Sequence, residues 1–182
     1  MQTLTNTYLI YFIREFGGDE SDMGLVLSLI AFSEIPAVAF SAVFLRKFGP
    51  ESLLRIAAAA GCIKFTMLIG IRSVQPFILI HLMHFFYSGM YMVSSVVFAD
   101  RIVGHDDAIK AQSVLAVGVA GITGVSANLI GGYMIEHFPI RMVIFLGAVF
   151  TLIGACCIFA ATMKRKDFGE TEHLSASGCS VN

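Results

Sequence analysis

Residues 23–45 read MGLVLSLIAFSEIPAVAFSAVFL, an apolar run with a single charged side chain, Glu34, near its middle. About 20 apolar residues are enough to cross the hydrocarbon core of a bilayer as a helix. A carboxylate at that depth costs about 2.5–3.5 kcal/mol on insertion scales, so we expect it to face the protein interior or a water-filled cavity. The stretch therefore predicts a membrane-spanning helix that carries a functional acid.

The rest of the chain has the same apolar character. Of its 182 residues, 57% are hydrophobic and 14% are charged, and the mean hydropathy of +0.80 exceeds that of soluble domains. We predict an all-α polytopic membrane protein of about six transmembrane helices. The first is truncated, because the apolar piece at residues 1–13 is too short to cross alone. The second and third predicted spans are residues 23–45 and 52–71. A predicted turn at residues 74–76 leads into the fourth, which extends to about residue 103. The fifth follows the loop at 104–107 and extends to about residue 136, and the sixth follows a turn near Pro139 and ends near residue 163.

The polar segments divide the chain into a membrane domain, residues 1–163, and a polar tail, residues 164–182, for which we predict disorder. Predicted loops lie at residues 17–22, 46–51 and 104–107. Basic residues concentrate in the loops after the second and fourth spans and in the tail, and by the positive-inside rule these face the cytoplasm. We therefore expect a plasma (inner) membrane protein with a cytoplasmic C-terminus. The net charge of −1 gives no indication of a nucleic-acid partner.

Lys64 is a second charge inside an apolar span. It shares one helix face with Ala57, Ala60 and Gly61, and small residues mark the face on which another helix packs closely. Lys64 therefore points inward, where it needs an anion or must lose its proton. Two hypotheses stay open, a static ion pair with Glu34 and a pair that exchanges during transport. We expect the ammonium to lie within side-chain reach of Glu34, His84 or Tyr87.

The fourth predicted span carries a stripe of polar residues at helical spacing. Its members are His81, His84, Ser88, Tyr91 and Ser95. Polar groups inside a membrane segment need partners or water, so the stripe is either polar contact between helices or the wall of a cavity. We favour the cavity wall and expect His81, Ser88 and Tyr91 to contact a solute. The two histidines suit a metal poorly because spacing supplies no further ligand, so we expect no metal.

Several motifs resemble a known family in their order and spacing. These are SEIP at residues 33–36, LRKFGP at residues 45–50, Lys64, and MHF at residues 83–85. Together they resemble the C-terminal six-helix half of the major facilitator superfamily. Within it, they resemble the group of lactose permease and the oligosaccharide, nucleoside and phenylpropionate proton symporters. The resemblance covers about residues 4–163, and it implies that an N-terminal six-helix half is missing from this chain.

The resemblance also implies roles for individual residues. Glu34 and Asn6 would contact the solute, and His84 would link the solute site to the proton site. Lys64 stands where the family usually has an arginine, and Tyr87 stands where lactose permease has its proton-carrying acid. In addition, Arg46, Lys47 and Gly49 match the superfamily's basic loop, which takes part in gating.

These observations predict half of a secondary active transporter that moves a small polar organic solute, sugar- or nucleoside-like. The proton gradient would drive it through Glu34, His84, Lys64 and Tyr87, with no cofactor. Alternatives are half of a drug–proton antiporter and a membrane fragment or scaffold that transports nothing. We do not expect an enzyme, because the sequence shows no nucleophile–base pair and no set of metal ligands.

Overall fold

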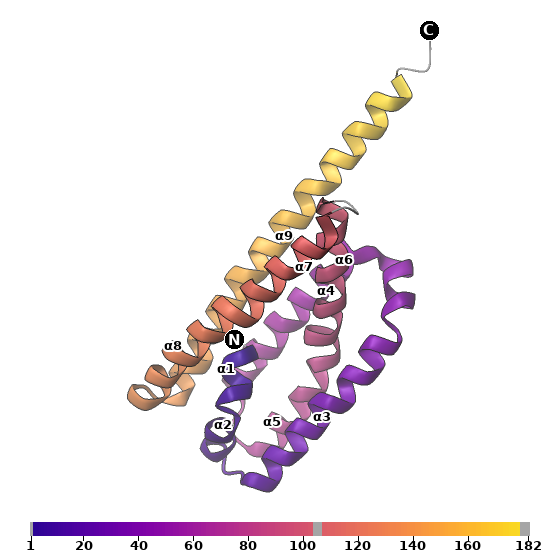
Figure 1. Ribbon diagram of the computed structural model, residues 1–182. Coiled ribbons are helices and arrows are strands. Elements are labelled where there is room, and N and C mark those ends of the chain that lie inside the picture. The colour runs from indigo at the N-terminus through magenta and orange to yellow at the C-terminus, as the bar shows by residue number, and fades with distance from the viewer. Residues whose placement is uncertain (1, 104–106, 179–182) are drawn as a thin grey trace.

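The computed structural model describes residues 2–103 and 107–178, and every element in these ranges is helical (Figure 1). The elements are α1 (Gln2–Thr7), α2 (Leu9–Glu15), α3 (Glu20–Ala39), α4 (Ser41–Gly70), α5 (Val74–Ile80), the 3₁₀ turn η1 (His81–Met83), the π-helical turn η2 (Phe85–Gly89), α6 (Met90–Val103), α7 (Ala108–Ala116), the π-helical turn η4 (Val117–Ile122), α8 (Thr123–His137) and α9 (Ile140–Gly178). The all-α prediction is confirmed.

Four helical stretches are long and apolar enough to cross a membrane. They are Glu20–Ala39, Ser41–Gly70, Val74–Arg101 and Ile140–Met163. The fifth predicted span lies on α7, η4 and α8, which follow one another with helical backbone at both junctions. Large apolar side chains such as Phe32, Ile35 and Leu129 are exposed on the outside of these helices. A bilayer covers such a surface favourably, whereas water does not.

The first helix is short, as predicted, and it is interrupted at Tyr8, which separates α1 from α2. The Tyr8 hydroxyl donates to the backbone oxygen of Asn128 on α8, at 2.8 Å. Gly131 and Gly132 leave room for this approach, since a Cβ at either position would lie within 3 Å of the Leu4 or Tyr8 side chain. The N-terminal segment is therefore tied to α8.

The predicted loop at residues 46–51 is wrong in extent. The backbone leaves the helical region inside α4 only at Gly49, where φ is 73° and ψ is 159°. A glycine adopts positive φ without steric cost, and Pro50 suits the first position of the helix that follows. The predicted span 23–45 is also divided, because α3 ends at Ala39 and a separate segment begins at Ser41. Arg46 and Lys47 thus lie on a short helix.

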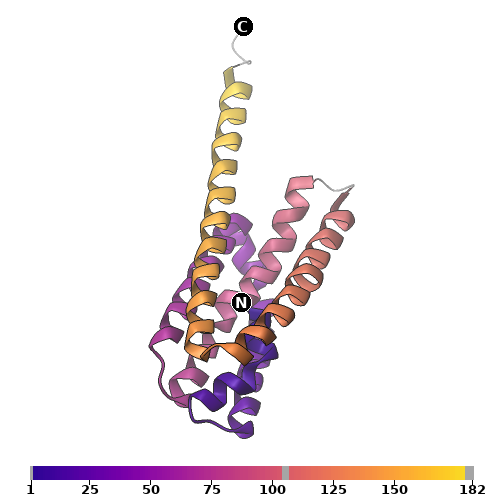
Figure 2. The same cartoon turned by 90° about the vertical axis from the view of Figure 1, so that its left-hand side faces the viewer.

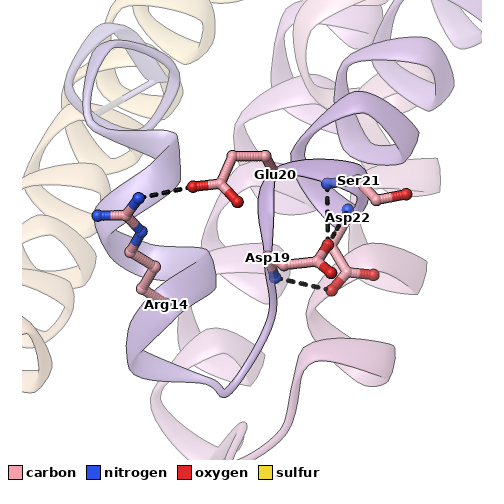
Figure 3. A network of polar contacts seen from close by, with 5 residues as sticks. All are labelled: Arg14, Asp19, Glu20, Ser21 and Asp22. Atoms are coloured by element: carbon pink, nitrogen blue, oxygen red, sulfur yellow. Dashed lines mark hydrogen bonds and ion pairs between the residues drawn. The ribbon is translucent and has the colours of Figure 1, made fainter.

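The turn between α2 and α3 is fixed by a reciprocal cap (Figure 3). The Asp19 carboxylate accepts from the backbone N–H of Ser21 and of Asp22, and the Asp22 carboxylate accepts from the N–H of Asp19. Beside it, Arg14 pairs with Glu20 at 2.6 Å. These contacts satisfy N–H groups that have no partner within the helix. As a result α3 begins at Glu20, inside the predicted loop 17–22.

The helix α9 continues through the segment for which the sequence predicted disorder, and it ends at Gly178. In Figure 2 it extends well beyond the other helices. Extending an existing helix requires no new nucleation, and residues 164–178 contain no proline to stop it. The last residues of the predicted tail, 179–182, lie outside the described residues, as do residues 104–106 of the predicted loop 104–107.

The main apolar core joins α2, α4, α5, α9 and the beginning of α3. Its fully buried members include Leu9, Phe12, Ile13, Val26, Phe65, Leu68, Phe77, Val143 and Ile144. These residues gather at the end of the bundle opposite the end of α9 (Figure 1). The core therefore fixes the start of α3 and the position of α5. Glu34 lies further along α3, and His81 and His84 follow α5 in the chain.

Replacing Asp19 by alanine should lower the free energy of unfolding by about 0.5–2 kcal/mol, because the α3 terminus loses its cap. Denaturant unfolding in detergent micelles measures this difference. Asp107→Ala is the matched control, since Asp107 occupies the N-cap position of α7 without a side-chain cap bond. Equal losses for the two variants would show that the Asp19 cap contributes nothing.

Candidate functional site

Glu34 on α3 meets His84 on the helical stretch Val74–Arg101, which corresponds to the fourth predicted span and is called the fourth span below. The Nε2 atom of His84 lies 3.0 Å from Oε1 of Glu34. An ionised carboxylate can only accept, so Nε2 is the donor in this hydrogen bond. The His84 side chain is 1% exposed, whereas the Glu34 side chain is 53% exposed. His84 therefore points to the side of Glu34, and Glu34 keeps one flank open.

A π-helical turn follows His84 directly and changes the predicted stripe. The buried face of the fourth span passes through Phe77, Ile80, His81 and His84, and then through Gly89, Met90 and Ser94. The step from His84 to Gly89 is five residues, which is the hydrogen-bond spacing of a π-helix. The regular stripe therefore ends at His84, and Ser88, Tyr91 and Ser95 are only half-buried.

Contacts with α3 before and after the π-helical turn explain the five-residue step from His84 to Gly89. Before the turn, His84 bonds to Glu34. After it, Gly89 faces Ala37, so closely that a Cβ on Gly89 would overlap the Ala37 Cβ. Residues on one face of an α-helix are three or four apart, so an α-helical register could not present both His84 and Gly89 to α3. The turn keeps both contacts.

Lys64 is fully buried, at 1% exposure, on the small-residue face of α4. Gly61 on this face lies against the Tyr87 ring, where a Cβ would approach within 2.6 Å. The Lys64 Nζ atom is 5.6 Å from the centroid of the Tyr87 ring and 5.7 Å from that of Phe65. Both distances lie within the range of cation–π attraction. The inward position of Lys64 and its approach to Tyr87 are confirmed.

The hypothesis of a static Lys64–Glu34 ion pair is wrong. In the part of the chain that the structure describes, Glu34 is paired with His84, and Lys64 is paired with no carboxylate. Glu34 bonds to His84 and its side chain is 53% exposed, whereas Lys64 is buried on the small-residue face of α4. Lys64 instead has His81 and His84 as electrostatic neighbours.

His81 is held by its own helix. Its Nδ1 atom lies 2.8 Å from the Phe77 backbone oxygen, and its ring packs on the Phe77 ring with centroids 4.9 Å apart. A carbonyl oxygen only accepts, so Nδ1 carries the proton and Nε2 of the neutral ring offers a lone pair. That Nε2 atom is buried and has no hydrogen-bond partner among the described residues. Such a group calls for an explanation.

The other predicted solute contacts are more dispersed. Asn6 is exposed on α1, and Ser88 and Tyr91 are half-buried on η2 and α6. None of the contacts described for the chain connects Asn6 with the Glu34–His84 pair. The roles of Asn6, Ser88 and Tyr91 in solute binding stay predictions.

The basic residues predicted to take part in gating lie next to an ion pair that the sequence did not reveal. Lys47 places its ammonium 5.4 Å from the Phe48 ring, and the break at Gly49 follows. Glu51, on α4, pairs with Arg101 near the end of α6 at 3.7 Å. The two partners are far apart in the sequence, so no local spacing could signal the pair.

The residues described by the structure contain no group of three or more metal-ligating side chains that could hold an ion. His81 and His84 are adjacent on the fourth span, but no third ligand joins them there. One acid, two imidazoles and one amine lie on helices of membrane-spanning length, and we call them the polar cluster: Glu34, His81, His84 and Lys64. The chemistry that these groups offer is hydrogen bonding and proton exchange.

A family model described as Major Facilitator Superfamily matches residues 1–177. The chain belongs to the Major Facilitator Superfamily. No curated protein and no solved structure matches it. Members of this superfamily move small solutes across membranes, so the chain is an integral membrane protein of a transporter family. The polar cluster therefore lies inside the membrane-spanning part of a transport protein.

Gly89→Ala should destabilise the protein by about 1–3 kcal/mol, because the added methyl group overpacks the contact with Ala37. Gly154→Ala on α9 is the matched control, since nothing lies within 4 Å of its Cβ position. Thermal unfolding in lipid nanodiscs compares the two variants. If Gly89→Ala is as stable as Gly154→Ala, the close approach of η2 to α3 is not a feature of the folded protein.

Proposed function

We propose that the chain acts as the C-terminal half of a secondary active transporter, moving a small polar organic solute of the sugar or nucleoside class together with protons. The observation that carries this proposal is the half-exposed Glu34 carboxylate, bonded to the fully buried His84. An acid inside a membrane span is costly, and such residues mark solute and ion pathways. The open flank of Glu34 gives a solute a place to bind.

Solute recognition follows from the chemistry of that carboxylate. Its oxygens accept hydrogen bonds, and hydroxyl groups of a sugar or nucleoside donate them. His84 holds one carboxylate oxygen and so orients the other towards a ligand. A few well-placed polar groups in otherwise apolar surroundings are typical of small-molecule sites. The resemblance to the lactose permease group supports the same solute class.

Proton coupling requires groups whose protonation differs between two conformations of the transporter. The cluster supplies them, because His84 contacts Glu34 and is an electrostatic neighbour of Lys64. A proton that binds in the cluster changes the net charge of the cluster and therefore the affinity of the site for a polar solute. The same exchange could serve an antiporter, in which solute and proton move in opposite directions.

We also propose that the protein lies in the plasma membrane with its C-terminus in the cytoplasm. Arg46 and Lys47 lie near the start of α4, Arg101 near the end of α6 and Lys110 near the start of α7. These segments lie towards the end of the bundle from which α9 extends (Figure 1). The excess of basic residues at that end supports a cytoplasmic position by the positive-inside rule.

Proteoliposomes containing the intact transporter, in which this chain is the proposed C-terminal half, should take up labelled lactose or uridine when a pH gradient is imposed. Glu34→Gln should lower this uptake at least tenfold, equivalent to about 1.4 kcal/mol, because the amide replaces the charged acceptor. The matched control is Glu136→Gln, an exposed acid on α8, which should retain uptake. The direction of proton movement, recorded with a pH-sensitive dye, separates symport from antiport.

Two results would contradict the proposal. One is the absence of uptake of both solutes by the unmodified protein. The other is a Glu34→Gln variant that transports as well as Glu136→Gln.

A further inference from the structure

We propose that a cavity between the ends of α2 and α4 and the start of α9 binds a membrane phospholipid. Its phosphate would lie on Arg141, and the first part of one acyl chain would enter the cavity. The site lies at the end of the bundle opposite the end of α9 (Figure 1). It shares no residue with the polar cluster, so this inference does not depend on the proposed transport.

The cavity has an apolar floor and a charged rim. Its volume is about 130 Å³, and the residues that line it are Phe16, Leu68, Ile69, Ile71, Arg141 and Ile144. Phe16, Leu68 and Ile144 are buried, whereas Ile69 and Arg141 are exposed. The floor therefore consists of apolar side chains, and the one charged group of the lining lies at the opening.

The cavity lies where two membrane-spanning helices reach the membrane surface. The span on α4 ends at Gly70, and the span on α9 begins at Ile140. Ile69 and Arg141 are each the next residue to one of these limits, so the cavity lies at the boundary between the hydrocarbon core and the headgroups. A phospholipid presents its phosphate at this boundary, with its acyl chains directly beneath. The guanidinium and the apolar floor follow the same order.

Arg141 offers a positive charge that is not engaged by a carboxylate. At this end of the bundle Arg14 pairs with Glu20, whereas Arg141 takes part in none of the ion pairs among the described residues. A guanidinium binds a phosphate through two parallel hydrogen bonds. Its aliphatic part packs on apolar surface while the charged head reaches the headgroups. Arg72, which directly follows the lining residue Ile71, is also exposed and supplies a second positive charge nearby.

The combination of groups favours a phospholipid over a free anion or an apolar molecule. A free phosphate would leave the apolar floor of the cavity uncovered, and an apolar molecule would make no use of the guanidinium. Outside the cavity, α4 and α9 expose further apolar side chains, among them Ile63, Met67 and Phe145. An acyl chain that starts in the cavity can continue along this surface, where its contact with the protein buries more apolar area.

The test uses the intact protein, purified in detergent and freed of bound lipid. Native mass spectrometry measures the Kd of the first phosphatidylglycerol molecule that binds. Two further ligands separate the parts of the lipid, because glycerol phosphate has the phosphate without the chains and diacylglycerol has the chains without the phosphate. Phosphatidylglycerol should bind more tightly than either of them.

Two variants address the two parts of the site, and each has a matched control. Arg141→Gln should raise the Kd of phosphatidylglycerol about fivefold or more, because the charged donor pair is lost. Its control is Arg14→Gln, an exposed arginine at the same end that is already paired with Glu20, and the Kd should stay within about twofold. Ile69→Phe should also raise the Kd about fivefold or more, because the larger side chain fills the opening. Its control is Ile63→Phe, an exposed position of α4 outside the lining.

Equal affinities of Arg141→Gln and Arg14→Gln for phosphatidylglycerol would overturn the proposal, because the headgroup would then not be bound at Arg141. Glycerol phosphate that binds as tightly as the lipid would overturn it too, since the site would then take a free anion. Equally tight diacylglycerol would show that the phosphate is not recognised. If Arg141→Gln does not fold, as judged by thermal unfolding, Ile69→Phe decides, and an affinity equal to that of Ile63→Phe overturns the proposal. No transport is measured, so the proposed function stands or falls separately.

Discussion

The hydrogen bond between Glu34 and His84 is the interaction on which the rest of the site depends. A carboxylate in an apolar span cannot be left without a partner, and the imidazole of the fourth span provides one at 3.0 Å. Because His84 must face α3 at this point and Gly89 must face Ala37 further along, the fourth span carries a π-helical turn between them. A local irregularity of the backbone therefore follows from these two contacts with α3.

Lys64 lies in different surroundings. Among the described residues, Glu34 bonds to His84, whereas the buried ammonium of Lys64 contacts the rings of Tyr87 and Phe65. A lysine held in this way is less constrained than one in a buried salt bridge, because ring faces attract a cation more weakly than a carboxylate does. The cluster thus combines an acid that is open on one flank with a buried amine that is paired with no carboxylate among the described residues.

Much of this arrangement can be predicted from the sequence, for reasons that are physical. Isolated charges such as Glu34 and Lys64 stand out in apolar runs, and small residues beside Lys64 show which way it points. The π-helical turn at Phe85–Gly89 could not be predicted, because a periodicity argument assumes a constant helical register. The Asp19–Asp22 cap has a local signal in the spacing of its two acids, but the apolar pattern alone places the start of the span at its first apolar residue. The pair of Glu51 and Arg101 had no local signal, because it joins separate helices.

A double-mutant cycle on Glu34 and His84 tests this account most directly. Unfolding free energies in detergent micelles would be measured for Glu34→Ala, His84→Ala and the double variant. A hydrogen bond to a charged group predicts a coupling energy of about 1.5–3 kcal/mol. The pair Glu34→Ala and His137→Ala, which share no described contact, should be additive within about 0.5 kcal/mol. Additivity of the Glu34 and His84 substitutions would contradict the account, because the two side chains would then not be bonded in the folded protein.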